Sequence, residues 1–176
     1  MVIISYIMLG VICMLSEEDY DNMTVAEGLE HYSRLMKMFR KKGIIRTNML
    51  AGDLGEYVAV EHYNATPALP NLRLLEIGAK DIDAISDTNE RYSIKASNGS
   101  ATGIFKGLNP PNSNLPEKKK FEYAIVVLFN DMKPRAMYEF DWQSFLEVKL
   151  WSNTHKAWYI NISEKSKRKS KIIYER

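Results

Sequence analysis

The sequence predicts an α/β fold in which helices flank a central mixed β-sheet, and three observations support this. Residues 121–129 form a continuous apolar run, which is typical of a strand buried on both faces. Residues 81–96 contain two short β-branched or apolar segments around turn-forming residues, which is typical of a β-hairpin. Residues 24–42 repeat apolar side chains at helical spacing. A chain of 176 residues with 45% hydrophobic residues can bury a full core, so we expect one domain over residues 16–176.

The first segment, Met1 to Leu15, is apolar throughout and is expected to lie outside this domain. It is shorter than the ~20 residues needed to span a bilayer, and it lacks the basic start and the small-residue cleavage site of a secretory signal. Because Met8, Met14 and Met23 are alternative starts, we interpret the segment as a leader added by an upstream translation start. A buried core element and a weak membrane anchor are the alternatives. We expect a cytoplasmic protein without stable membrane association.

Two long helices are expected before the sheet. Thr24 to Glu27 has the spacing of a capping box and Gly43 is a typical helix stop, so the first helix is expected over 24–42. Its apolar stripe is expected to face the core, and its basic side is expected to be solvated or to touch nucleic acid. The second helix is expected over 53–64. The apolar stripe of the first helix consists of Val25, Leu29, Tyr32, Met36 and Phe39.

The remaining segments predict about five strands and a short helix. The run Phe121 to Phe129 is expected as the central strand, and a turn at Asn130 and Asp131 leads to its hairpin partner. Asp141 is a typical N-cap, which predicts a helix that ends near Lys149. From about residue 163 the chain is expected to form a basic tail. The other expected strands are a short one at 73–77, the two hairpin strands within 81–96, the partner strand at 135–140 and a last strand at 157–162.

Charge and cysteine content limit the classes of function. The net charge is only +2, but acids gather in residues 16–30 and bases in residues 34–46 and 163–176. Basic blocks of this kind fit a surface that meets phosphates, although they are also typical of solvated faces. The single cysteine, Cys13, excludes an internal disulfide and a cysteine-based zinc cluster. Three histidines without ligand spacing also argue against a zinc site.

The hairpin carries the residues that indicate chemistry. Side chains alternate along a strand, so Ser93 and Lys95 share one face, and Asp81 and Asp83 share a face of the partner strand. Folding the hairpin about its turn is expected to bring Asp83 opposite the segment from Ser93 to Lys95. A carboxylate beside a lysine is the arrangement that a metal-assisted phosphodiester hydrolase requires. An ordinary cross-strand ion pair is the structural alternative.

Two motifs in this region resemble a known superfamily. The helix entry contains Gly-Ile-Ile-Arg-Thr-Asn from Gly43 and Gly-Asp-Leu-Gly-Glu-Tyr from Gly52, and the hairpin contains Asp-Ala at Asp83 and Arg-Tyr-Ser-Ile-Lys-Ala from Arg91. A helix glutamate, a strand aspartate and a strand Ser-x-Lys together resemble the PD-(D/E)xK nuclease superfamily, in particular small bacterial restriction-endonuclease-like proteins. The resemblance covers about residues 43–129 and implies a restriction-endonuclease-like core for the α/β fold.

The resemblance implies an endonuclease that uses Mg²⁺ or Mn²⁺ to cleave double-stranded DNA, as a homodimer on a palindromic site. Asp83 would bridge the metal, Lys95 would orient or deprotonate the attacking water, and the backbone carbonyl of Ile94 would be a further ligand. Glu56 would match the helix glutamate that some members add to the metal ligands. Ser93 departs from the pattern, because most members have Glu or Asp there. A hydroxyl is a neutral and weaker ligand, so the fold without the activity is expected unless Glu56 or a water compensates.

Two carboxylates near this site have structural alternatives. Glu56 follows Asp53 at capping-box spacing, so a bond from its side chain to the helix N-terminus is as well supported as metal binding. Gly52 and Gly55 favour a metal ligand, because glycines allow the helix to approach the sheet closely. Asp81 is either a spare acid for the site or the solvated start of the strand.

The loop over 97–120 is the longest irregular stretch and follows Lys95 closely. Loops of this length are commonly functional or disordered, so it is expected either to contact DNA or to be a plain mobile loop. A non-catalytic nucleic-acid-binding module on the same fold and an unrelated α/β interaction protein are the two alternative functions. The expected phosphate contacts are Lys106, Lys118, Lys119 and Lys120, and the expected base contacts are Asn98, Ser100, Thr102 and Asn112.

Overall fold

The computed structural model describes residues 15–76, 78–79 and 81–176. The apolar leader assigned to residues 1–15 lies outside the described residues except for Leu15. The chain divides into two compact units, one that ends at Lys42 and one that spans Gly43–Arg176. A boundary therefore falls inside the range that the sequence suggests as one domain. None of the described helices combines the length and apolarity that crossing a membrane requires.

The described part of the first unit consists of helices α1 (Glu17–Asp21) and α2 (Val25–Lys41). The expected capping box opens α2, since the Thr24 hydroxyl accepts a hydrogen bond from the Glu27 amide and the Glu27 carboxylate accepts one from the Thr24 amide. Gly43 follows the helix with a φ of 71°, the left-handed conformation that commonly ends a helix. The predicted helix and its two ends are confirmed.

The apolar stripe of α2 does not form the core face that the sequence predicts. Val25, Leu29 and Tyr32 are 81%, 64% and 53% exposed, and no residue of α2 is buried. The periodic pattern correctly predicts an amphipathic helix, but the described part of its own unit contains no core that covers the apolar side. The basic side is solvated as expected, with Arg34 bonded to Glu30 one turn earlier at 2.8 Å.

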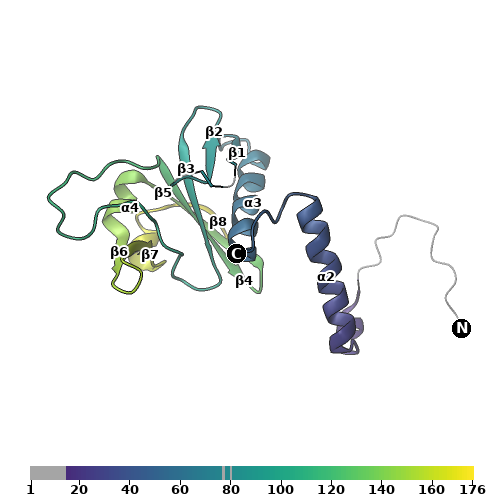
Figure 1. The fold of residues 1–176 in the computed structure, drawn as a ribbon. Helices are drawn as coiled ribbons and strands as arrows, with labels where there is room; N and C mark the ends of the chain where they lie inside the picture. Colours follow the sequence, from purple (N-terminus) through teal and green to yellow (C-terminus); the bar gives the residue numbers. More distant parts are fainter. Residues whose placement is uncertain (1–14, 77, 80) are drawn as a thin grey trace, which may run out of the picture. The chain divides into compact units, whose positions relative to one another are not determined.

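The second unit is built on a six-stranded sheet in the order β1-β2-β3-β4-β5-β8 (Figure 1). Strands β3 and β4 are parallel and all other neighbours are antiparallel, so the predicted mixed sheet of an α/β protein is confirmed. A separate ribbon of β6 and β7 and three helices complete the unit. Its elements are α3 (Leu50–Ala65), β1 (Leu72–Leu74), β2 (Ala84–Ser86), β3 (Arg91–Ser97), β4 (Tyr123–Asn130), β5 (Lys133–Asp141), α4 (Trp142–Val148), β6 (Lys149–Ser152), β7 (Ala157–Ile160), α5 (Glu164–Lys167) and β8 (Lys171–Glu175).

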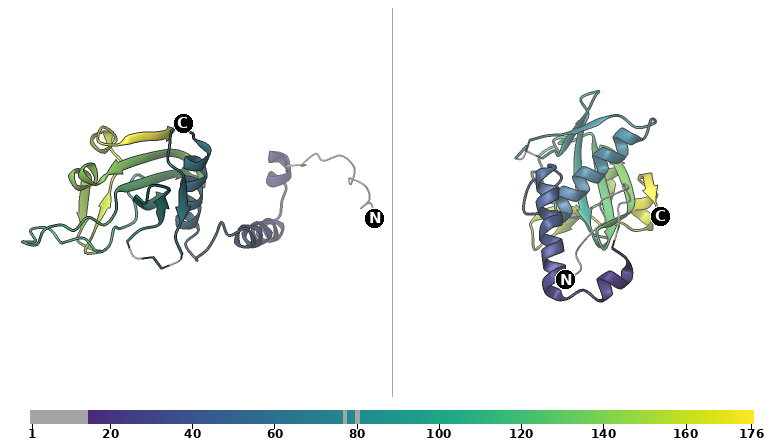
Figure 2. Two further views of the ribbon diagram at one scale, coloured as in Figure 1. Left: turned by 90° about the horizontal axis from the view of Figure 1, so that it is seen from above. Right: turned by 90° about the vertical axis from the view of Figure 1, so that its right-hand side faces the viewer.

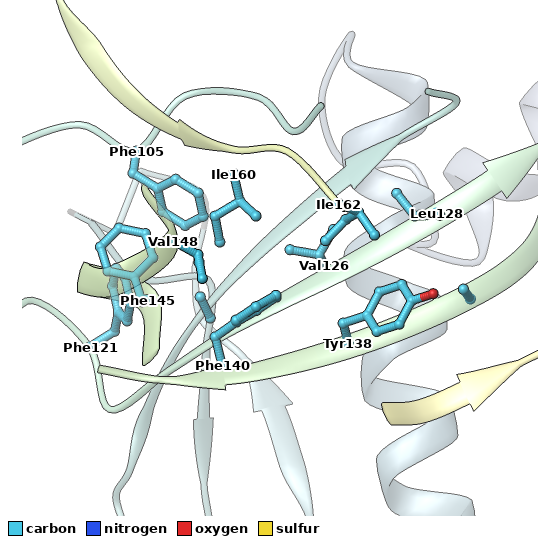
Figure 3. Packing of buried hydrophobic residues seen from close by; sticks show 12 residues of the cluster. Phe105, Phe121, Val126, Leu128, Tyr138, Phe140, Phe145, Val148, Ile160 and Ile162 are labelled. Carbon is cyan, nitrogen blue, oxygen red and sulfur yellow. The ribbon is translucent and has the colours of Figure 1, made fainter. Parts of the chain in front are cut away.

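Strand β4 is the central strand that its apolar run predicts, because its side chains alternate between two hydrophobic clusters. On one face Val126 packs in a cluster with Phe145 of α4 and with Ile160 of β7 (Figure 3). On the other face Val127 packs in a cluster with Tyr63 of α3. The sheet is therefore covered by α3 on one side and by α4 with the β6–β7 ribbon on the other.

The C-terminal segment, expected as a basic tail, instead forms α5 and the edge strand β8 (Figure 2). Tyr138 of β5 pairs with Ile172 of β8, and its hydroxyl donates to Glu175 at 2.7 Å. The Lys167 ammonium bonds the same carboxylate at 2.8 Å. Charged residues are common on edge strands because they discourage pairing with other chains, so the bases of this segment are part of the sheet edge.

The other predicted elements are present with shifted ends. The helix expected at 53–64 begins earlier, as α3, and the strand expected at 73–77 is limited to β1 among the described residues. Asp141 is the N-cap of α4, since its carboxylate accepts from the Ser144 amide at 2.7 Å. The expected last strand, at 157–162, is found as the shorter β7.

The loop between β3 and β4 is anchored over its first part. Residues 101 and 105 form isolated β-bridges with Asn161 and Trp158, which flank and belong to β7. The Thr102 hydroxyl accepts from the Ile160 amide at 3.0 Å and donates to the Gly103 carbonyl at 2.7 Å, so it is not the free base contact that the sequence predicts. Beyond this anchored part the loop extends away from the sheet (Figure 1).

Candidate active site

The hairpin of β2 and β3 brings Asp83 and Lys95 together. Ala84 pairs with Tyr92 across the hairpin, which places Asp83 beside β3 just before β2 begins. Lys95 Nζ lies 3.0 Å from Asp83 Oδ2, and the two side chains are 22% and 23% exposed. Both line a cavity of about 460 Å³. The predicted approach of these side chains at a concave surface is confirmed.

The open edge of β3 holds the Asp83 carboxylate in this position. The Tyr92 carbonyl of β3 accepts a hydrogen bond from the Asp83 amide at 2.8 Å. Backbone groups alternate in direction along a strand, so two residues later Ile94 directs its amide and carbonyl to the same side of β3 as Tyr92 does. At Ile94 this side lies beyond the start of β2. There Asp83 Oδ2 accepts from the Ile94 amide at 2.6 Å, and Lys95 Nζ donates to the Ile94 carbonyl at 2.9 Å. The two side chains thus satisfy backbone groups that β2 does not reach.

Ser93 lies in the same cavity. Its side chain is buried, and its hydroxyl donates to Asp83 Oδ2 at 3.3 Å. Lys95 Nζ also lies 5.6 Å from the centroid of the Phe105 ring, within the range of a cation–π interaction. The three hairpin residues that the sequence singles out therefore meet at one point, under an aromatic ring from the following loop.

Glu56 approaches the site from helix α3. The helix begins at Leu50 and its N-cap residue makes no side-chain hydrogen bond, so Glu56 lies in the second turn and the capping alternative is wrong. Gly55 explains how the helix comes so near the sheet, because a Cβ at this position would lie 2.4 Å from the Cβ of Ala96 on β3. The expected role of a glycine in close helix–sheet approach is confirmed at Gly55.

Asp53 holds the chain that precedes this helix. It is 3% exposed, and its Oδ2 accepts from the amides of Arg46 and Thr47 at 2.9 and 2.6 Å. The Thr47 hydroxyl donates to the same carboxylate at 3.0 Å. Asp53 is thus not the N-cap that its spacing suggests, because its partners lie upstream of the helix.

Arg46 is a site residue that sequence reasoning does not identify. Its guanidinium forms an ion pair with Glu56 and donates to the Leu75 carbonyl at 2.7 Å. The Arg46 and Glu56 side chains are 20% and 19% exposed. The only signal for Arg46 in the sequence is its place in the helix-entry motif, which does not indicate a partner.

The Glu56 carboxylate has Asp83 as a charged neighbour. Burial raises the pKa of Glu56 and the negative charge of Asp83 raises it further, whereas Arg46 and Lys95 lower it. Glu56 and Asp83 also line one small cavity of about 100 Å³, together with Arg46. The Glu56 carboxylate therefore lies on the side of Asp83, as metal binding would require.

Asp81 does not occupy the strand position that the sequence predicts. Its φ is 68°, it precedes β2, and its carboxylate forms an ion pair with Lys120 Nζ at 3.0 Å. The Asp81 side chain is only 14% exposed, so it is not a solvated strand start. It nevertheless lines the same cavity as Asp83.

The expected DNA-contacting residues fall into two groups. Lys119 and Lys120 are engaged within the protein, with Glu122 at 3.5 Å and Asp81 at 3.0 Å. Lys106, which lines the cavity of about 460 Å³ at Asp83, is exposed. The other exposed members are Asn98, Ser100, Asn112 and Lys118, and Lys119 is also exposed despite its ion pair.

Three partly buried ion pairs make the site electrically balanced. They are Asp83–Lys95, Glu56–Arg46 and Asp81–Lys120. Each of these three carboxylates has one cation, so none of the three offers an unpaired negative charge to a divalent metal. An added phosphate would compete for the three cations and leave carboxylate oxygens free.

The donor types at the site fit a Mg²⁺ ion, which prefers oxygen ligands. All described bonds to Asp83 end on Oδ2, and none of the described residues donates to Oδ1. The described residues contain no group of three His, Cys, Asp or Glu side chains with metal-binding geometry. Mg²⁺ often uses only one or two carboxylates and completes its ligands with water and substrate phosphate. Asp83, the Ile94 carbonyl and Glu56 supply oxygen atoms of the type that this mode uses.

Comparison with models of known protein families finds no match for this chain, and comparison with curated proteins finds no similar sequence. The α/β architecture alone does not define a function, because one fold supports many. The residues of the site therefore have to indicate what the protein does.

Proposed function

We propose that this protein is a Mg²⁺-dependent DNA endonuclease of the PD-(D/E)xK type, similar to restriction endonucleases. The observation that carries the proposal is the position of the Lys95 ammonium in the cavity of about 460 Å³ at Asp83. The ammonium lies 3.0 Å from Asp83 Oδ2 and 2.9 Å from the Ile94 carbonyl. Hard oxygen donors next to an amine are the groups that metal-assisted phosphodiester hydrolysis uses. Glu56 of helix α3, which forms an ion pair with Arg46, supplies a second carboxylate.

In the proposed reaction each residue has a separate task. The Lys95 ammonium orients the attacking water by donating a hydrogen bond to it, whereas taking a proton from the water would require its neutral amine form. Asp83 together with the Ile94 carbonyl keeps the Lys95 side chain in the cavity. Arg46 positions Glu56. Mg²⁺, when held by Asp83, Glu56 and the Ile94 carbonyl, would stabilise the charge that develops on the phosphate. Mn²⁺ takes the same oxygen ligands and is expected to substitute.

Cleavage of supercoiled plasmid tests the proposal directly. Wild-type protein with Mg²⁺ should convert the plasmid to nicked and linear forms, and chelation with EDTA should stop the conversion. Asp83→Asn keeps the size of the side chain but removes its charge, and it should lose the activity. Absence of metal-dependent cleavage with both Mg²⁺ and Mn²⁺, on single-stranded as well as double-stranded DNA, would falsify the proposal.

A homodimer is part of the proposal for double-stranded DNA. Two active sites related by a two-fold axis match the two strands of a palindromic site. Light scattering after size exclusion, with and without DNA, measures the mass of the complex. A single copy on a doubly cleaved palindrome would argue against the dimer while leaving the chemistry intact.

A second candidate function is a non-catalytic DNA-binding module on the same fold. Ser93 supplies a neutral hydroxyl where an acid would add charge, and Lys95 already occupies the space between Asp83 and the Ile94 carbonyl. Such a protein would bind DNA with steep salt dependence and would not cut it. A third possibility is an interaction protein with an ordinary ion pair, which would show neither salt-sensitive DNA binding nor cleavage.

Glu56→Gln should lower Mg²⁺ affinity and cleavage together by about tenfold or more, because a site without an acid at position 93 depends on this second charge. Titration calorimetry with Mg²⁺ in the presence of a non-cleavable DNA analogue, and single-turnover cleavage, measure the two effects. Glu61→Gln, an exposed change on the same helix, is the matched control. If Glu56→Gln altered only the melting temperature, its role would be restricted to pairing with Arg46.

A further inference from the structure

A second large cavity, separate from the two cavities at Asp83, lies between the β6–β7 ribbon and the anchored part of the loop after β3. Its volume is about 680 Å³, larger than that of the cavity at Asp83 and within the range of small-molecule sites. Trp151 and Tyr159 line it from the ribbon, and residues 101–104 line it from the loop. Its walls therefore combine aromatic side chains with polar groups. The polar side chains among its lining residues are Thr102, Ser152, Asn153 and His155.

The second cavity adjoins the candidate active site. Ile104 lines both cavities, so the two share one wall. The neighbouring Phe105 is bridged to Trp158 of β7 and also lies against the Lys95 ammonium. The backbone at the boundary of the two cavities is thus held in place beside Ile104.

We infer that this second cavity binds an unpaired nucleobase of the strand whose phosphate lies at Lys95. The ligand must carry negative charge for Lys95 and Lys106 and a flat, partly apolar group for Trp151 and Tyr159. A nucleotide strand has both features in alternation. Stacking of a base on an aromatic side chain strengthens binding roughly five- to 150-fold and tolerates every base. The inference rests on the proposed function, because it takes the phosphate site from it.

This site determines the class of nucleic acid that is bound. A base inside a duplex is stacked and paired, so it enters a side pocket only after it leaves the helix. The substrate therefore contains an unpaired nucleotide beside the phosphate that is cut, in a single strand, a frayed end or a flipped-out position. Fully paired DNA engages the phosphate site alone and binds more weakly.

Binding of fluorescent oligonucleotides in EDTA tests this without any cleavage. The probes are a single-stranded oligothymidylate and a blunt-ended, fully paired duplex with the same number of phosphates. Tyr159→Leu and Trp151→Leu should each weaken the single-stranded complex by about tenfold and change the duplex complex by less than about twofold. Tyr174→Leu replaces a partly buried tyrosine on β8, outside this cavity, and should bind both probes like wild type.

Trp151 packs edge-on against Trp158 with ring centroids 5.2 Å apart, so melting temperatures accompany every measurement. Trp151→Phe keeps a flat ring and should retain most of the affinity. If folded Tyr159→Leu and Trp151→Leu bound oligothymidylate as well as Tyr174→Leu does, or if wild type bound neither probe, the base site would be rejected. If they lost affinity while wild type cut neither plasmid nor single-stranded DNA with Mg²⁺ or Mn²⁺, the base site would stand and the nuclease would be rejected.

Discussion

Lys95→Ala is expected to abolish cleavage and to leave DNA affinity nearly unchanged. In the proposed mechanism the ammonium acts on the attacking water and on the charged transition state, so its loss removes stabilisation in the chemical step and little in ground-state binding. Groups that move or orient protons in a transition state contribute about 10²- to 10⁴-fold, so the single-turnover rate should fall at least about 100-fold. Nicking rate, DNA affinity and melting temperature, measured on the same preparation, provide the comparison.

The alternative role of Lys95 predicts a different result. As an ordinary partner of Asp83, its removal would leave a partly buried carboxylate without a countercharge and would cost stability. Lys106→Ala is the control, because Lys106 lines the same cavity but is exposed. The Lys106→Ala variant should bind DNA more weakly and with less salt dependence, and the rate at which it cleaves bound DNA should change little. A Lys95→Ala protein that melts early but cuts at the wild-type rate where folded would exclude a catalytic role.

The hairpin and the central strand are predictable because their sequence signals are local. The turn at residues 87–90 and the alternation on both sides of it set the register, which places Asp83 opposite Ser93 and within side-chain reach of Lys95 on the same face. The unbroken apolar run of β4 indicates burial on both faces. Neither inference needs knowledge of contacts with remote parts of the chain.

The rest of the site depends on pairs that sequence spacing does not encode. Arg46 reaches a carbonyl 29 positions away at Leu75, and Lys120 reaches Asp81 across 39 positions. Asp53 shows how a local rule fails when a tertiary contact competes with it. Its capping-box spacing is present in the sequence, but its buried carboxylate serves amides upstream of the helix, so the helix begins earlier.

Strand β8 and helix α2 show the limits of pattern and composition. β8 escapes sequence analysis because Lys171 and Glu175 at its ends resemble a solvated tail, although charges are also typical of edge strands. The stripe of α2 predicts that one side of the helix is apolar, but periodicity does not say what covers that side. For both elements, the segment that each one packs against depends on contacts with remote parts of the fold.

Gly55→Ala is expected to destabilise the Gly43–Arg176 unit, although alanine is the better helix former. The new Cβ would lie 2.4 Å from the Cβ of Ala96 and 3.6 Å from its Cα, and neither atom is the end of a flexible side chain that can turn away. Overpacking of this kind costs about 1–3 kcal/mol, which exceeds the helix-propensity gain of about 1 kcal/mol. Because a 2.4 Å approach is a severe clash, the overpacking cost lies at the upper end of its range, and we expect a net loss near 2 kcal/mol, or roughly 5–10 °C in Tm.

Two companion variants separate the clash from any general effect of the substitution. Gly52→Ala lies on the same helix, where a Cβ would meet only the Met49 Cβ at 3.7 Å, so it should be neutral or stabilising by up to about 1 kcal/mol. Ala96→Gly added to Gly55→Ala removes the clashing atom and should restore most of the stability, which a double-mutant cycle measures as a coupling energy. Because Glu56 follows Gly55 directly, the single mutant should also lose cleavage in proportion to the shift of the helix, and the double mutant should recover it. Equal stability of Gly55→Ala and Gly52→Ala would mean that α3 does not need this close approach to place Glu56.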